Sequence, residues 1–137
     1  MKQYSTNYQD TFIKVAEDSP AIKGESPPMK GENKTVASMQ FELISAHPYR
    51  YTSDDVLFQV YADRNDLLPQ DYDEARKIFF SKGQACLRAS PLTKRYGWGI
   101  HHDKTGKIAL YGLESPEYEK LANDQSIKHV NAMRSTR

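Results

Sequence analysis

Residues 98–111, WGIHHDKTGKIALY, determine the fold class that the chain predicts. Two short runs rich in aromatic and aliphatic residues, 98–101 and 107–111, flank the turn sequence HDKTG at 102–106. Aspartate and glycine adopt turn conformations readily, and their position between two such runs is typical of a β-hairpin. We therefore expect two antiparallel strands in this part of the chain.

The residues on either side of the hairpin predict two more strands and a helix. Residues 84–90, QACLRAS, place small or apolar side chains at alternate positions, as a strand does. Ser115 and Pro116 indicate a helix start, because a serine hydroxyl can cap a helix and proline fits its first turn. This helix is expected to end near Asn123, and residues 127–133 predict a last strand.

Residues 34–46 predict the first helix of the chain. Apolar side chains recur there at intervals of three or four residues and would form one buried stripe: Val36, Met39, Leu43 and Ala46. Asn33 is the expected N-cap. His47 precedes Pro48, and the residue before a proline is disfavoured in helical conformation, so the helix should end there.

Two further helices are expected between positions 52 and 83. Thr52 or Ser53 can cap the second helix, and the acidic residues that follow favour the positive end of the helix dipole. The segment 55–62, DVLFQVYA, is also compatible with a strand. The third helix should begin near Pro69 and end at Gly83.

Ahead of these helices, residues 10–16, DTFIKVA, predict a short strand, because Phe12 and Lys14 alternate with the β-branched Ile13 and Val15. Residues 17–33 follow with three prolines and two glycines, which interrupt regular elements. We expect a long loop there. Loops of this length are uncommon in compact domains and often serve a function.

Together these segments predict an α+β fold, in which three or four helices pack on an antiparallel sheet of about four or five strands. With 137 residues, the chain has the length of a single domain that spans positions 1–137. No apolar run approaches the roughly 18 residues that a bilayer span needs, and the first residues lack the apolar segment of a secretion signal. The single cysteine excludes an internal disulfide. We expect a cytoplasmic protein without membrane contact.

The stretch 82–102, KGQACLRASPLTKRYGWGIHH, is the strongest candidate for a binding site. It contains no Asp or Glu, although the chain has 18 such residues, and it holds four cationic side chains and the only tryptophan. Positive charge beside aromatic rings suits an anionic group. We expect the ligand to contact five residues of this stretch: Arg88, Arg95, Tyr96, Trp98 and His101. The arginines would pair with the anion, the two rings would supply apolar contact, and the histidine would donate or accept a hydrogen bond.

The sequence gives less support to several other classes of function. The net charge is +1 and the pI is about 7.8, which disfavours general binding to nucleic acid. Neither GxGxxG nor GxxxxGK[ST] occurs, so no nucleotide cofactor is predicted. His101 and His102 are adjacent on a predicted strand and would point to opposite faces, so no metal site is predicted.

Cys86 supports the main alternative. A thiolate is a nucleophile, and His101 or His102 could activate it in a hydrolase or transferase. No motif of a known cysteine enzyme surrounds it, and an isolated cysteine in a strand is usually a small buried apolar residue.

Charge also differs along the chain. Residues 1–81 hold 9 Lys and Arg against 13 Asp and Glu, a net charge of −4, whereas residues 82–137 hold 10 against 5, a net charge of +5. This asymmetry supports a third hypothesis, a protein–protein interaction module.

The sequence also resembles a family of small bacterial proteins of unknown function. The resemblance extends over nearly the whole chain and is carried by these segments: TFIKVAEDSP at 11–20, KGENKTVASMQFE at 30–42, PYRYTSDDV at 48–56, KGQACLRASPLTKRYGWGIHHDKTGKIALYGLESPEY at 82–118, and AMRSTR at 132–137. It implies a stand-alone cytoplasmic domain with no established activity, cofactor or catalytic residues. The leading hypothesis from the sequence is a small binding protein for an anionic small molecule.

Overall fold

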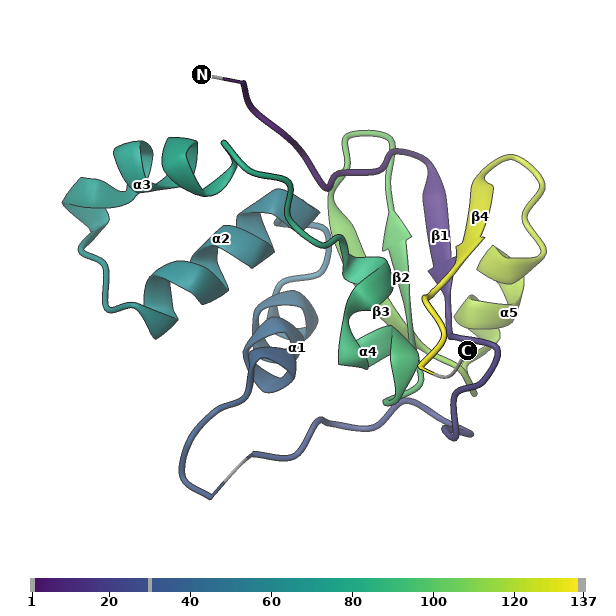
Figure 1. The fold of residues 1–137 in the computed structure, drawn as a ribbon. Helices are drawn as coiled ribbons and strands as arrows, with labels where there is room; N and C mark the ends of the chain where they lie inside the picture. Colours follow the sequence, from purple (N-terminus) through teal and green to yellow (C-terminus); the bar gives the residue numbers. More distant parts are fainter. Residues whose placement is uncertain (1, 30, 136–137) are drawn as a thin grey trace.

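A four-stranded sheet and five α-helices form the described part of the chain, residues 2–29 and 31–135, in the computed structural model. The strands are β1 (Thr11–Lys14), β2 (Trp98–His102), β3 (Ile108–Gly112) and β4 (Lys128–Asn131). The helices are α1 (Val36–Ala46), α2 (Ser53–Arg64), α3 (Tyr72–Phe79), α4 (Pro91–Lys94) and α5 (Pro116–Ala122), with 3₁₀ turns at Pro69–Asp71 and Leu87–Ala89. The three longest helices, α1 to α3, lie to one side of the sheet (Figure 1). No helix of residues 2–29 and 31–135 is long and apolar enough to cross a membrane.

The sheet is mixed, so the predicted all-antiparallel sheet is wrong. Its order is β3-β2-β1-β4, in which β2 runs antiparallel to both neighbours and β4 runs parallel to β1. The hairpin of β2 and β3 is confirmed. The chain then passes through α5 to the far edge of the sheet, and this crossover lets β4 run in the same direction as β1. The α+β class and the number of strands agree with the prediction.

The predicted strand at 84–90 is wrong. Leu87–Ala89 forms a 3₁₀ turn, and Ser90 caps α4 through its hydroxyl, which accepts a hydrogen bond from the Leu92 amide. The backbone groups here form hydrogen bonds within local turns: the Ala89 amide donates to the Cys86 carbonyl, and the Ser90 amide donates to the Leu87 carbonyl. Because α4 forms in this part of the chain, the structure has one helix more than the predicted three or four.

The first helix is confirmed, but its cap and its buried face differ from the prediction. Thr35, not Asn33, caps α1, because its hydroxyl accepts from the Ser38 amide. The buried residues are Ala37, Ser38, Gln40 and Ile44, whereas Ala46 is exposed and Val36, Met39 and Leu43 are only partly buried. The buried glutamine explains the shift: its side-chain oxygen accepts a hydrogen bond of 2.7 Å from the buried Ser90 hydroxyl. A pattern of apolar residues alone could not reveal this polar contact.

The second helix is confirmed, and the alternative of a strand at 55–62 is wrong. Thr52 and Asp55 form a capping box, in which each side chain accepts a hydrogen bond from the other residue's amide. The third helix ends at Phe79, earlier than the predicted stop at Gly83. The last helix begins at Pro116 with Ser115 as its cap, as predicted.

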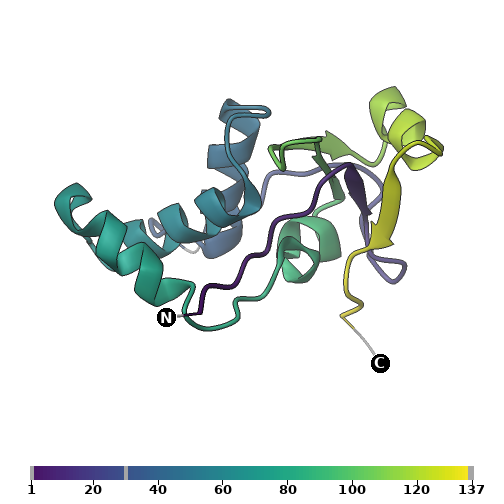
Figure 2. The same ribbon diagram turned by 90° about the horizontal axis from the view of Figure 1, so that it is seen from above.

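The extended N-terminal segment, residues 2–10, lies between the helices and the sheet and connects them. It runs from the end of α3 to the start of β1 (Figure 2). The Tyr4 amide donates to the Phe80 carbonyl, and the buried Asp54 carboxylate accepts from the Ser5 hydroxyl and from the Thr6 amide and hydroxyl. The segment therefore holds α2 and α3 against the rest of the molecule.

The long loop was predicted correctly, since the described residues between β1 and α1 form no helix or strand longer than an isolated bridge. Its first half lies on the start of β2. The Glu25 amide donates to the Tyr96 carbonyl, and the Trp98 indole donates to the Glu25 carbonyl at 2.8 Å. Gly97 makes this approach possible, because its φ is +78° and a Cβ there would overlap the Lys23 carbonyl.

Candidate functional site

A cavity of about 440 Å³ lies between the end of α1, residues 50–51, α2 and α3. This volume is in the range of small-molecule sites. Its walls combine aliphatic and aromatic side chains with two arginines, two carboxylates and one amide: Leu43, Arg50, Tyr51, Asp55, Val56, Phe58, Gln59, Tyr72, Asp73 and Arg76.

An ion pair between α2 and α3 forms one wall of the cavity. Arg76 Nη2 lies 2.9 Å from Asp55 Oδ1, while Asp55 Oδ2 accepts the capping bond from the Thr52 amide at 3.0 Å. Burial raises the pKa of Asp55, but the Thr52 amide and the Arg76 guanidinium outweigh it and hold the pKa below its ordinary value. The carboxylate is therefore ionised at neutral pH, and it keeps the Arg76 side chain in place.

Aromatic rings fix the same arginine. The Arg76 guanidinium lies 5.8 Å from the centre of the Phe58 ring and 5.6 Å from that of Phe80. Phe58 also packs edge to face on Tyr72, with 5.5 Å between ring centres. Cation–π contact and ring packing thus give this wall a defined shape before any ligand binds.

Arg50 supplies a positive charge that the protein leaves available. Its guanidinium lies 5.8 Å from the centre of the Tyr51 ring. None of the ion pairs within residues 2–29 and 31–135 includes Arg50. Gln59, which also lines the cavity, donates hydrogen bonds to Asp63 at 2.8 Å and to the Tyr72 hydroxyl at 3.3 Å. The cavity can therefore hold an anionic group at Arg50 and a ring between aromatic walls.

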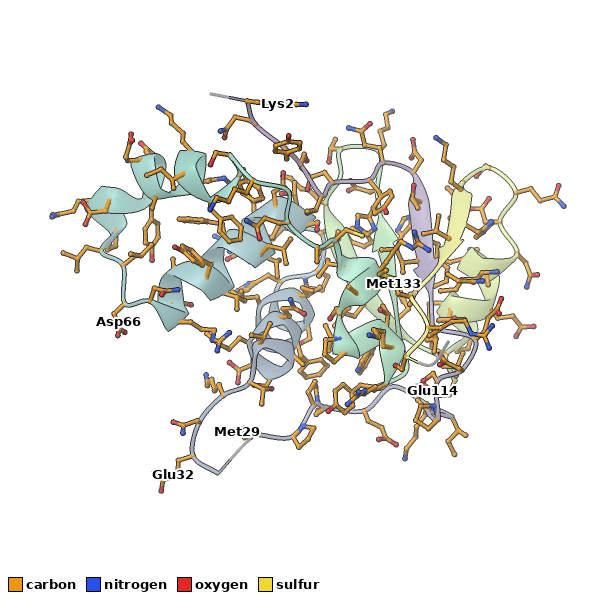
Figure 3. The ribbon with its side chains drawn as sticks, in the orientation of Figure 1. Lys2, Met29, Glu32, Asp66, Glu114 and Met133 are labelled. Carbon is orange, nitrogen blue, oxygen red and sulfur yellow. The ribbon has the colours of Figure 1, made fainter. Side chains whose placement is uncertain are left out.

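The five residues predicted to bind a ligand do not all line one hollow. The Arg88 side chain donates from Nε to the Asn131 carbonyl at the end of β4. Arg95 and Tyr96 line a hollow of about 420 Å³ together with Met29 of the long loop, which Figure 3 labels. The structure thus brings Arg95 and Tyr96 together, and their binding role stays a prediction.

Trp98 and His101 lie on opposite faces of β2, as their spacing of three residues requires. Trp98 packs on Phe41 of α1, with 5.4 Å between ring centres. On the other face, His101 Nδ1 lies 2.8 Å from the Tyr49 hydroxyl. A ligand that contacts Trp98 on one face of the sheet would therefore not contact His101 on the other face.

Cys86 is partly exposed, and its Sγ lies 3.6 Å from the Tyr8 hydroxyl. In the part of the chain that the structure describes, no hydrogen bond joins Cys86 to a histidine, and no group of three or more His, Cys, Asp or Glu side chains could hold a metal ion. His102 is completely buried, with its ring edge to face with Tyr8.

The sequence interpretation missed the cavity because its charged residues come from segments that are separated along the chain. Asp55 and Arg76 are 21 positions apart, and each has a local explanation in a helix cap or a helix surface. The only available signal was the concentration of aromatic residues and arginine along α2 and α3. The spacing of these residues did not show that they face a common space.

The structure defines an α+β protein with a mixed sheet and a group of three helices that encloses a candidate binding cavity. The chain belongs to DUF6157, a family of unknown function, whose model matches residues 1–137. This match confirms the resemblance seen in the sequence. No curated protein and no solved structure shows a significant match to the chain.

Proposed function

We propose that the protein binds a small anionic molecule that carries a ring, in the cavity between α1, α2 and α3. The observation that supports this most is the combination of Arg50, which has no ion-pair partner within the described residues, with aromatic walls that are already fixed. Arginine binds carboxylate and phosphate groups through charge-assisted hydrogen bonds.

The carboxylates in the cavity narrow the class of ligand. Asp55 and Asp73 balance the charges of Arg50 and Arg76, so the site as a whole is close to neutral. A molecule with several negative charges would meet repulsion from Asp73. The best match is a ligand with one acidic group at Arg50, a ring beside Tyr51 and Phe58, and a hydrogen-bond donor toward the carboxylates.

A thermal-shift screen tests the proposal. The purified protein would be heated with aromatic carboxylates, phosphorylated metabolites and nucleotides. A ligand at about 100 times its dissociation constant stabilises the folded state by about 2.7 kcal/mol, which corresponds to several degrees for a chain of this size. The strongest stabilisation is expected from a ring compound with a single acidic group.

Two matched variants locate the site. Arg50→Ala should abolish the shift, whereas Arg95→Ala, which removes an exposed arginine from the separate hollow, should leave it unchanged. If Arg95→Ala abolishes the shift and Arg50→Ala does not, the ligand binds in the 88–101 segment that the sequence predicts, and the cavity proposal is wrong.

A further inference from the structure

A groove runs along the side of α2 that faces away from the arginine cavity, mostly apolar at one end and partly polar at the other. It consists of two adjoining hollows, of about 400 and 220 Å³, which share Val36, Gln40 and Leu57. The larger hollow continues along α2 to Arg64, and the smaller one is also lined by residues of the segment between α3 and α4, Cys86 among them. The α2 residues that line the groove recur at helical spacing: Leu57, Val60, Tyr61 and Arg64.

The charge that the described lining residues place along this groove is entirely positive and lies at one end. Among the described residues that line it, Arg64 at one end is the single charged side chain, and there is no carboxylate. No ion pair of the described residues includes Arg64. A groove that is mostly apolar at one end and carries one cation at the other complements a molecule with an apolar body and one anionic end.

A polar donor lies midway along the groove. Gln40 is 4% exposed, and its oxygen accepts from the Ser90 hydroxyl. Its amide nitrogen has no hydrogen-bond partner among the residues that the structure describes, and the residue lines both hollows. A single donor cannot satisfy the several amides and carbonyls of a peptide backbone, and polar groups buried without partners are costly. An alkyl chain brings no polar group of its own into the groove, and it fits where it leaves the Gln40 amide nitrogen in contact with water.

We propose that the groove binds a single-chain amphiphile with an anionic head, such as a medium-chain carboxylate. The head pairs with Arg64, and the alkyl chain lies along Leu57 and Val36 toward Cys86. From Leu57 to Arg64 the helix rises about 10 Å, which a chain of eight or more carbons can follow. This site is separate from the cavity of the proposed function, because its cation and its walls are different residues.

The first test is a calorimetric titration of the protein with octanoate, decanoate and dodecanoate, each below its micelle-forming concentration. One site is expected, and affinity should rise by up to about fourfold for each added methylene that enters the groove, from the free energy of burying a CH₂ group. Dodecyltrimethylammonium has the same chain with a cationic head and should bind at least tenfold more weakly than dodecanoate.

Variants then assign the two ends of the ligand. Arg64→Gln should weaken dodecanoate about tenfold and should strengthen binding of the cationic amphiphile, because it removes the repulsive charge. Arg50→Ala should change neither. Ala85 is exposed and lines the smaller hollow, so Ala85→Leu should fill that hollow without disturbing the fold. The affinity of this variant should then depend less on the length of the alkyl chain. Circular dichroism would confirm that each variant is folded.

The alkylation rate of Cys86 can show whether the alkyl chain of the ligand reaches the smaller hollow, because Cys86 lines that hollow and is the only cysteine. Dodecanoate at saturation should slow its alkylation by iodoacetamide severalfold, as measured by mass spectrometry. The proposal is wrong if dodecanoate does not bind, if the cationic amphiphile binds equally well, or if bound dodecanoate leaves the alkylation rate unchanged. Loss of dodecanoate binding in Arg50→Ala would instead place the amphiphile in the cavity of the proposed function.

Discussion

The hydroxyl of Tyr49 lies 2.8 Å from Nδ1 of His101, although the two residues are 52 positions apart. The same hydroxyl lies 2.7 Å from that of Tyr111. Tyr49 reaches both in the left-handed backbone conformation, with a φ of +59°, which is uncommon for a bulky residue. Its amide donates to the Ile108 carbonyl, and the Ile108 amide donates to Tyr51. The contacts of this tyrosine therefore hold the start of the α2 region on the edge of the sheet.

Removal of the Tyr49 hydroxyl should destabilise the protein. In Tyr49→Phe, both His101 and Tyr111 lose a partner in a half-buried position, so we expect the free energy of unfolding to fall by about 1–2 kcal/mol. Urea denaturation followed by circular dichroism would measure the change. Tyr96→Phe is the matched control, because the Tyr96 hydroxyl makes no hydrogen bond with the described residues. An equal loss in both variants would contradict the role given to this contact.

His102 should make the protein less stable in mild acid. Burial lowers its pKa from 6.5 to about 4. The unfolded chain therefore binds a proton between pH 6.5 and 4 that the folded protein does not, so the free energy of unfolding falls as the pH falls through this window. The free energy of unfolding that depends on His102 is fully present above about pH 6.5, and roughly 3 kcal/mol of it is lost when the pH falls below 4.

The variant His102→Leu tests this dependence. Neither ring nitrogen of His102 has a hydrogen-bond partner within the described residues, so an apolar side chain of similar volume removes no such bond. The stability of the variant should change less than that of the wild type between pH 7 and pH 5, in urea denaturation at both pH values. His47→Leu, at a partly exposed position, is the matched control. Parallel pH curves for wild type and His102→Leu would exclude His102 as the cause.

Three glycine-to-alanine variants separate backbone strain from steric overlap. Gly97→Ala combines a φ of +78° with a collision against the Lys23 carbonyl, and we expect a loss of about 3 kcal/mol or more in unfolding free energy. Gly31→Ala has a φ of +64° and open space, so about 1 kcal/mol is expected. Gly83→Ala has neither problem and should be nearly neutral. Thermal unfolding of all three would show this order, and a harmless Gly97→Ala would disprove the close approach of the long loop to β2.

Asp54 should control the attachment of the N-terminal segment. Asp54→Ala leaves the Thr6 amide, the Thr6 hydroxyl and the Ser5 hydroxyl without their acceptor, and we expect a loss of about 2–4 kcal/mol. Hydrogen exchange should also speed up at the Tyr4 and Thr6 amides, because the segment detaches before the molecule unfolds globally. Asp63→Ala, at an exposed position of the same helix, is the control. Unchanged exchange at Thr6 would count against this attachment.

The elements that the sequence predicted correctly are those whose signals are local. The hairpin depends on a turn between two apolar runs, and the helix that begins at Pro116 depends on a cap one residue away. The helix that begins at Ser53 depends on the reciprocal bonds of Thr52 and Asp55, three positions apart. Such signals involve a few neighbouring residues, so they act wherever the rest of the chain lies.

Other features required contacts between distant residues. Alternation at 84–90 resembled a strand, yet the carbonyls there are used by local turns and Ser90 bonds to Gln40, 50 positions away. The direction of β4 follows from the path of the crossover, not from its own residues. The five residues predicted to form one site share a stretch of sequence, but strand alternation and the turn before α4 direct them to different parts of the surface.

The sequence by itself therefore determined the class of the fold, the starts of α2 and α5 and the hairpin, because short-range hydrogen bonds and backbone preferences specify them. Only the tertiary structure decided which face of α1 is buried, how the sheet is ordered and where a cavity forms. Arg50, Asp55 and Arg76 become neighbours only after α2 and α3 pack together. Packing depends on contacts across tens of residues, and neither composition nor periodicity specifies which of these contacts form.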